Sequence, residues 1–258
     1  MRPLSVGLRI CALALAVGLA GCNDREQSYQ GWIEANLVFV GPDDAGRVVT
    51  LAVREGDHID KGAPLFTVDS DLQEADVASL KATLLNAQQT FTRAQSLLKS
   101  GAGTQKDFDA AQSVLRDTEA RLNSAQTRLV RRNVLSPATG AVQQVYYRPG
   151  EVVSAGRAIV SLLPPSNLKV RFYVPETILP HITYGDIVKV HCDGCGADLK
   201  ARVSFISGSA EFTPPVIYSL DERSKLVFLI EALPDDPDKL RAGQPIDVTL
   251  APAQEAKR

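Results

Sequence analysis

The chain has 258 residues, enough for two or three domains. Hydrophobic residues make up 45% and charged residues 22%, which is the composition of a folded globular protein and not of a disordered chain. The formal net charge is −2, from 28 Lys and Arg against 30 Asp and Glu, so no basic excess indicates a nucleic acid as partner.

The first 21 residues have the pattern of an export signal. Arg2 and Arg9 precede an apolar run over residues 10–19 that is too short to span a bilayer as a stable helix. The run ends in Leu-Ala-Gly-Cys at residues 19–22, which resembles the lipobox of bacterial lipoproteins, in which the cysteine is acylated and becomes the mature N-terminus. The alternative is an ordinary secretory signal that happens to contain Cys22, and either signal takes the mature protein out of the cytoplasm.

We therefore predict a signal peptide at residues 1–21 and lipidation at Cys22. Residues 22–30 are polar and are expected to form a tether. Acyl chains on Cys22 would anchor the protein to a membrane without a transmembrane helix.

An internal repeat follows, in two copies. Gly-Arg-Val at 46–48 recurs as Gly-Ala-Val at 140–142, and Arg-Glu-Gly at 54–56 recurs at the same offset as Arg-Pro-Gly at 148–150. Two such β units cannot each bury a face alone, so we expect one to pack on the other in a small sandwich. The first half, with one or two N-terminal strands, is predicted at 31–69 and the second at 134–165.

Residues 70–133, between the two halves, carry two apolar stripes whose spacing alternates between three and four. The positions are Val77, Leu80, Leu84, Ala87, Phe91, Ala94 and Leu98, then Phe108, Ala111, Leu115, Thr118, Leu122, Ala125 and Leu129. Each stripe is a heptad seam of about three heptads, the pattern of a coiled coil. Gly101 and Gly103 interrupt the pattern, so the two helices must fold back antiparallel. We expect the sandwich to clamp the bases of both helices together.

The ends of these helices carry signals of their own. Ser70 and Gln73 have the spacing of a capping box, and Thr104 with Asp107 places an acceptor and an anion at the start of the second helix. Because the residue before a proline disfavours the helical region, Ser136 before Pro137 predicts the exit from the second helix.

Short alternating stretches predict a further β domain over residues 166–250. Apolar residues at 168, 170, 172 and 174 alternate with Lys169, Arg171 and Tyr173, which indicates a half-buried strand. Other strands are predicted at 187–191, 201–206, 225–231 and 246–250. Many short strands separated by turn residues favour a small antiparallel barrel or sandwich. The tail, residues 251–258, is expected to be disordered.

Cys192 and Cys195 flank an Asp-Gly pair, which predicts a two-residue hairpin with Cα atoms close enough for a disulfide. An oxidising compartment favours that bridge. A metal site that adds His191 is the alternative, but the second ligand pair of a structural zinc site is missing, so no metal is expected. A thioredoxin-like role is not expected, because no βαβ pattern surrounds the two cysteines. Cys11 is removed with the signal peptide.

Taken together, these parts resemble the HlyD-type membrane-fusion family, the periplasmic adaptors of tripartite efflux and secretion systems. The resemblance rests on the lipobox, the split repeat, the heptad hairpin and the β region ending Leu-Arg-Ala-Gly-Gln at 240–244, and it covers about residues 31–250. It implies an α+β, mainly β fold: a split lipoyl-like β-sandwich with an inserted antiparallel coiled-coil hairpin, followed by a small antiparallel β-barrel.

The resemblance also implies partners. In this family the hairpin reaches toward a TolC-like outer-membrane channel, the barrel lies nearer an inner-membrane transporter, and the adaptor forms a homo-oligomeric ring, a hexamer. Ala-Glu-Phe-Thr-Pro-Pro at 210–215 resembles a segment of adaptors encoded with ATP-binding-cassette exporters. Polar residues on the outer faces of the helices would let neighbouring hairpins pack side by side: Asn86, Gln88, Gln89, Gln95 and Gln112.

Channel-binding adaptors of the family carry an arginine, a leucine four residues later and a serine seven beyond that. Arg93, Leu97 and Thr104 keep this spacing, with threonine in place of serine. Arg93 would donate hydrogen bonds to carbonyls or carboxylates of the channel, Leu97 would fill an apolar notch and Thr104 would cap the joint. The alternative is structural, with Thr104 as an N-cap, Leu97 packed beside the seam and Arg93 a solvated charge.

Two other classes of function fit less well. A biotinyl or lipoyl carrier presents a modified lysine in the turn that joins the halves, usually beside methionine, whereas the only methionine here is Met1 and the hairpin occupies that joint. A hydrolase or metalloenzyme is disfavoured because His58, His181 and His191 are scattered without a paired nucleophile and base. We therefore expect a non-catalytic adaptor without a cofactor, held in the periplasm at the inner membrane by acylated Cys22.

Overall fold

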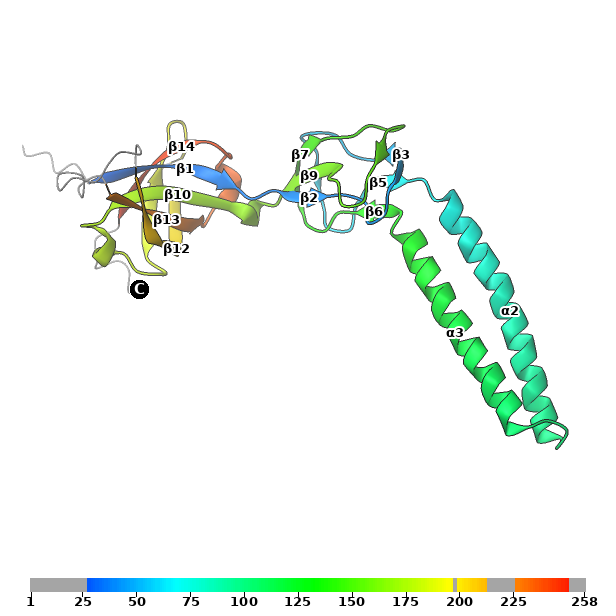
Figure 1. Cartoon of the computed structure of the whole chain (residues 1–258). Coiled ribbons are helices and arrows are strands. Elements are labelled where there is room, and N and C mark those ends of the chain that lie inside the picture. The colour runs from blue at the N-terminus through cyan, green and yellow to red at the C-terminus, as the bar shows by residue number, and fades with distance from the viewer. Residues whose placement is uncertain (1–26, 197–198, 213–225, 251–258) are drawn as a thin grey trace, which may run out of the picture. The chain divides into compact units, whose positions relative to one another are not determined.

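The computed structural model describes residues 27–196, 199–212 and 226–250 (Figure 1). The signal peptide, Cys22, most of the predicted tether, the end of the 210–215 segment and the tail lie outside these residues. The chain divides into two units, Ala35–Leu168 and the combination of Met1–Glu34 with Lys169–Arg258. The prediction of a mainly β protein with two helices is confirmed.

The unit Ala35–Leu168 contains two four-stranded sheets and the helix pair. One sheet has the order β2 (Val38–Val40), β9 (Val160–Leu163), β7 (Gly140–Val145) and β4 (His58–Ile59); the other has the order β6 (Asn133–Leu135), β5 (Pro64–Val68), β3 (Gly46–Leu51) and β8 (Val152–Val153). Each sheet takes two strands from each half of the repeat. The halves therefore interlock by exchanging strands, whereas we had expected one half to stack on the other.

The exchange is reciprocal at the level of single hydrogen bonds. The N–H of Gly56 donates to the C=O of Val142 at 2.9 Å, and the N–H of Gly150 donates to the C=O of Val48 at 2.8 Å. These are equivalent bonds in the two halves, because 56 corresponds to 150 and 48 to 142 in the repeat. The glycine-marked repeat is thus a repeat of the structure as well as of the sequence.

Between the two sheets lies one continuous apolar core. Its buried members come from both halves: Val40, Val48, Val53, Ile59, Leu65, Phe66, Val68, Val142, Val153, Ile159, Val160 and Leu162. Since neither half supplies a complete sheet, burial of this core requires both.

Two long helices lie between β5 and β6: α2 (Asp71–Lys99) and α3 (Gln105–Val130). They run side by side (Figure 1), and every position of the two predicted seams is buried or half-buried. Near the base, Val77, Leu122 and Ala125 form a cluster with Leu80, Leu84 and Leu129. Near the turn, the rings of Phe91 and Phe108 lie 5.4 Å apart.

The helix ends agree with the predictions in one case of three. Thr104 caps α3, because its Oγ1 accepts a hydrogen bond from the N–H of Asp107 at 3.1 Å. The capping box at Ser70 was wrong: its side chain makes no cap bond and instead donates to Oε1 of Glu74 at 2.7 Å. The exit at Ser136 was also wrong, since α3 ends at Val130 and the next residues pair with β5 as strand β6.

The other unit is a closed barrel. Its strand order is β1 (Ser28–Ala35), β10 (Leu168–Pro175), β13 (Leu226–Pro234), β12 (Leu199–Phe212), β11 (Ile187–His191) and β14 (Pro245–Leu250). Three short 3₁₀ turns lie in the described residues, at Pro165–Asn167, Leu179–His181 and Pro237–Lys239. The predicted strands at 201–206 and 225–231 belong to the longer β12 and β13.

Strand β1 corrects the predicted domain boundaries. We assigned residues up to 30 to a tether and the following strand to the first repeat half, but β1 begins at Ser28 and pairs with β14 in the barrel. Tyr29 and Ile33 are buried there, and Gly31 allows the close approach of β10, since a Cβ at this position would lie 2.2 Å from the carbonyl oxygen of Arg171. The alternation of apolar residues marks a strand but does not say which sheet it joins.

The seam predicts a contrast between two leucines of the helix pair. Leu122→Ala removes a side chain that is 9% exposed and should lower the free energy of unfolding by about 2 kcal/mol. Leu85→Ala, at a side chain that is 57% exposed, should cost less than about 0.5 kcal/mol. Urea unfolding followed by circular dichroism at the helix band measures both, and equal costs would contradict the packing.

Candidate functional site

The turn that joins α2 to α3 is held by its backbone. The C=O of Leu97 accepts hydrogen bonds from the N–H groups of Ala102 and Gly103, both at 3.0 Å. Gly101 has a φ of 76°, in the left-handed region that favours glycine. A Cβ at position 103 would lie 3.0 Å from the Cβ of Leu97, so Gly103 lets the turn close against that leucine. The tip is therefore a defined surface.

Arg93, Leu97 and Thr104 lie at this tip in different environments. Arg93 and Leu97 are one helical turn apart and share a face of α2. Leu97 is 44% exposed, and Arg93 is exposed and forms no ion pair with any residue of the described ranges. The hydroxyl of Thr104 is already engaged, because it accepts from the N–H of Asp107 and donates to Oδ2 of Asp107 at 2.7 Å. Arg93 and Leu97 are thus available to a partner, and Thr104 has a structural role.

Two shallow grooves run along the helix pair. The first follows α2 and is lined by Leu85, Gln88, Gln89, Thr92, Arg93 and Ser96. The second lies between the helices and is lined by Thr83, Asn86, Ala87, Thr90, Asp107, Ala110, Ala111 and Val114. Small and polar side chains predominate in both, and Leu85 and Val114, each 57% exposed, add apolar surface. Grooves of this kind can accept ridges of side chains from another helix.

The polar positions that we predicted on the outer faces of the helices separate into two groups. Asn86, Gln88 and Gln89 are exposed, whereas Gln95 and Gln112 are half-buried. Of the five predicted positions, the three exposed ones therefore lie in the middle of α2.

On the outer wall of the barrel, Arg171 is the centre of a paired cluster. Its guanidinium forms an ion pair with Glu34 and lies 5.7 Å from the centre of the Trp32 ring. The hydroxyl of Tyr173 donates to Oε2 of Glu211 at 2.9 Å, and burial, followed by this hydrogen bond, raises the pKa of Tyr173 above its usual range. These charged and aromatic groups pair with one another across β1, β10 and β12, although Nε of Arg171 is buried without a hydrogen-bond partner among the described residues.

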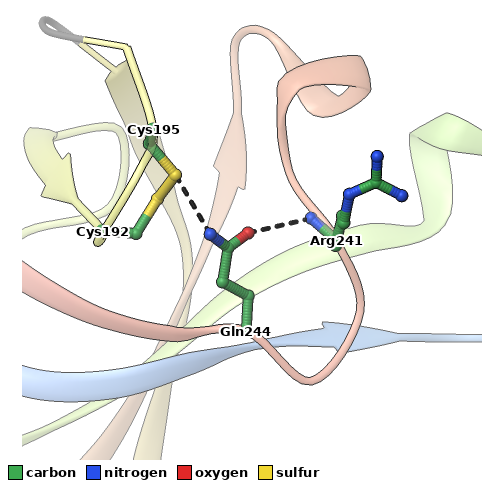
Figure 2. The surroundings of a disulfide bond; sticks show 4 residues. All are labelled: Cys192, Cys195, Arg241 and Gln244. Carbon is green, nitrogen blue, oxygen red and sulfur yellow. Dashed lines mark hydrogen bonds between the residues drawn. A yellow bond between two sulfur atoms is a disulfide. The ribbon is translucent and has the colours of Figure 1, made fainter.

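The structure joins Cys192 and Cys195 by a disulfide, with their Cα atoms 5.3 Å apart (Figure 2). The N–H of Cys195 donates to the C=O of Cys192 at 3.1 Å, and Gly194 has a φ of 79°, so the Asp-Gly pair lies at the centre of a tight turn. The predicted two-residue hairpin was wrong, because β11 and β12 pair only as far as Val190 and Leu199, which leaves a longer connection.

Gln244 links this turn to the segment before β14. Its Nε2 donates to Sγ of Cys195 at 3.2 Å, and its Oε1 accepts from the N–H of Arg241 at 3.2 Å (Figure 2). In the sequence, Gln244 is distinguished only as part of the family-like ending at 240–244. His191 is exposed at the end of β11, and within the described ranges no group of three or more His, Cys, Asp or Glu residues is arranged to hold a metal ion.

The helices in the described part of the chain do not include one that is long and apolar enough to cross a membrane. Residues 36–163 match the family model described as "RND MFP, barrel-sandwich hybrid domain", a range that contains both interlocked sheets and the helix pair. The chain belongs to the membrane-fusion protein family. This family consists of periplasmic adaptors, as the sequence resemblance implied.

Two relatives of this membrane-fusion protein align with most of its chain. A UPF0194 membrane protein of Acidithiobacillus ferridurans is 26% identical over 85% of this chain and 85% of its own length. A UPF0194 membrane protein of Yersinia enterocolitica is 25% identical over 96% of this chain and 98% of its own length. Both relatives are described as membrane proteins.

Solved structures share the fold. The membrane fusion protein Spr0693 of Streptococcus pneumoniae R6 aligns with a TM-score of 0.69 at 18% identity, covering 87% of this chain and 99% of that one. A chimera of MacA with the α-hairpin domain of Pseudomonas aeruginosa MexA aligns with a TM-score of 0.69 at 21% identity, covering 87% of this chain and 81% of that one. At these identities the likeness concerns the fold alone.

The hydroxyl of Thr104 predicts a stability effect that is separate from binding. Thr104→Ala removes the acceptor for the N–H of Asp107 and should lower the free energy of unfolding by about 1 kcal/mol, whereas Thr104→Ser keeps the acceptor and should cost little. Thermal melting of the helix signal compares the two variants. An equal loss in both would mean that the methyl group, and not the cap, is what matters.

Proposed function

We propose that this membrane-fusion protein is a non-catalytic adaptor that links an inner-membrane exporter to a TolC-like outer-membrane channel for efflux or secretion. The observation that carries the proposal is the helix pair with its exposed tip, inserted at a single point of the interlocked sandwich. A carrier of biotin or lipoate is the alternative, and it is disfavoured because the helix pair occupies the joint in which such carriers present their lysine.

The tip contacts the channel through two side chains in this proposal. Arg93, exposed and without an ion-pair partner in the described ranges, donates charge-assisted hydrogen bonds to carbonyls or carboxylates at helix ends of the channel. Leu97, half-exposed on the same face, fills an apolar notch. Thr104 keeps the turn in shape by capping α3.

Several copies form the ring that surrounds the exported compound, and a hexamer is the expected number. The grooves along α2 and between the helices support side-by-side packing, because their small and polar linings let a neighbouring helix approach closely. A conduit of this kind requires contact between copies but no tight site for the transported compound.

The transporter partner is an inner-membrane exporter, and the segment 210–215 favours the ATP-binding-cassette class. The matched family model carries the RND name instead. Co-purification of the adaptor with its transporter, followed by an ATPase assay, separates the two classes, because only the first hydrolyses ATP.

Photo-cross-linking in the native cell tests the tip directly. A photo-reactive amino acid at position 93 or 97 should cross-link to an outer-membrane channel, since both side chains are exposed at the tip end of α2. The same group at Lys81, which is exposed in the half of α2 nearer the sandwich, is the matched control and should not reach the channel. Cross-links from position 81 and none from positions 93 and 97 would overturn the assignment of the tip.

The lipid anchor is tested separately. Cys22→Ser removes the predicted site of acylation, so the protein should move from the membrane fraction to the soluble periplasmic fraction. Cys11→Ser, within the signal, is the control and should leave fractionation unchanged. Retention of the Cys22→Ser protein in the membrane fraction, from cells that lack the transporter, would contradict the anchor.

A further inference from the structure

The chain leaves the sandwich before α2 and re-enters it after α3 at points that are neighbours in space. The N–H of Val68 donates to the C=O of Arg132 at 2.9 Å, which joins the end of β5 to the residue that follows the last turn of α3. Asp69, at the start of α2, accepts from the N–H of Arg47 at 2.8 Å. These bonds hold the start of α2 and the end of α3 next to each other on the sandwich.

Arg132 is the most buried charged side chain at this junction. It is 9% exposed, and its Nη1 donates to the carbonyl oxygen of Ala45 at 3.0 Å and to that of Asp44 at 3.4 Å. Its Nε is buried without a hydrogen-bond partner. Burying a guanidinium is costly, so the position of Arg132 depends on these two carbonyl groups.

The segment that supplies the carbonyls also fits closely around both helix bases. A Cβ at Gly46 would lie 2.4 Å from Oδ1 of Asp69 and 3.0 Å from Nη1 of Arg132. At the repeat-equivalent Gly140, the three atoms nearest to such a Cβ are backbone atoms of Leu163 and Pro164. At Gly46, by contrast, the close neighbours include the Arg132 side chain at the end of the sandwich that carries the helices.

A second arginine contacts the same segment from outside. Arg131 forms an ion pair with Asp43 at 3.0 Å, but the two side chains are 63% and 60% exposed. Exposed pairs contribute little and are screened by salt. The contacts of Arg131 and Arg132 therefore differ in solvent exposure, since only the contact of Arg132 is shielded from solvent.

We propose that Arg132 is the positioning residue that sets the direction of the helix pair on the sandwich. It ties the end of α3 to residues 44 and 45, which lead into β3. The effect at the tip is large, because α3 is about 39 Å long at the usual helical rise, so a rotation of about 10° at the base moves the tip by about 7 Å. The proposal concerns the isolated chain and is independent of any channel.

Distance measurements between spin labels test this role. The labels are carried by keto amino acids at the exposed positions 89, on α2, and 143, on β7, in the full chain, so that the disulfide and Cys22 are untouched. Arg132→Met should broaden the distribution of distances at least two-fold. Arg132→Lys, which keeps the charge but offers a single ammonium group, should broaden it by less.

The matched control is Arg128→Met, one turn earlier on α3, where the side chain is 58% exposed and lies 3.9 Å from Asp76. It should leave the distribution unchanged, and circular dichroism verifies that each variant is folded. An unchanged width in Arg132→Met, or equal broadening in Arg128→Met, would overturn the proposal. If Arg132→Met does not fold, an unchanged width in folded Arg132→Lys overturns it.

Salt distinguishes the two arginines. In 0.5 M sodium chloride, at a Debye length of about 4 Å, the unaltered chain should keep its distribution because the contact of Arg132 is buried. Broadening of that distribution by salt would assign the positioning to the exposed Arg131–Asp43 pair and would contradict the role of Arg132.

Discussion

Reciprocal strand exchange between the two repeat halves is the constraint on which the rest of this unit depends. Neither half forms a complete sheet: β3 completes its sheet with β8 of the other half, and β4 pairs with β7. The core between the sheets is buried only when both halves are present. The exchange brings the end of the first half next to the start of the second, where Val68 and Arg132 share a backbone hydrogen bond. The helix pair is thus held at its base by the sandwich.

The helix pair has the properties of a part that works by contact. Each helix packs against the other along a single seam, which includes small residues such as Ala87, Ala111 and Ala125. Much of the surface of each helix is therefore free to contact another protein. The cost of this design is that the helices depend on the seam and the base for stability, since long surface helices gain little from propensity alone. The tip, closed by Leu97 and Gly103, remains a defined surface at the far end.

Periodicity predicted most of what is local. Spacings of three and four identified every seam position, and the Thr104 cap follows from the preference of hydroxyl side chains for helix starts. Periodicity could not predict strand partners, because alternation indicates which face of a strand is buried but not which sheet the strand joins. For that reason β1 was assigned to the wrong domain, and the interlocking of the halves was missed. No sequence pattern indicated the contacts of Arg132 and Gln244, since these contacts involve segments far away in the chain.

The central claim is that the helix tip, and not the barrel, meets the outer-membrane channel. Electron cryomicroscopy of the assembly purified from the native membrane tests this claim most directly. The account predicts that density for residues 93–104 lies against the end of a channel, with the helix pairs of neighbouring copies side by side. A channel held by the barrel strands, or helix tips that contact nothing, would contradict it.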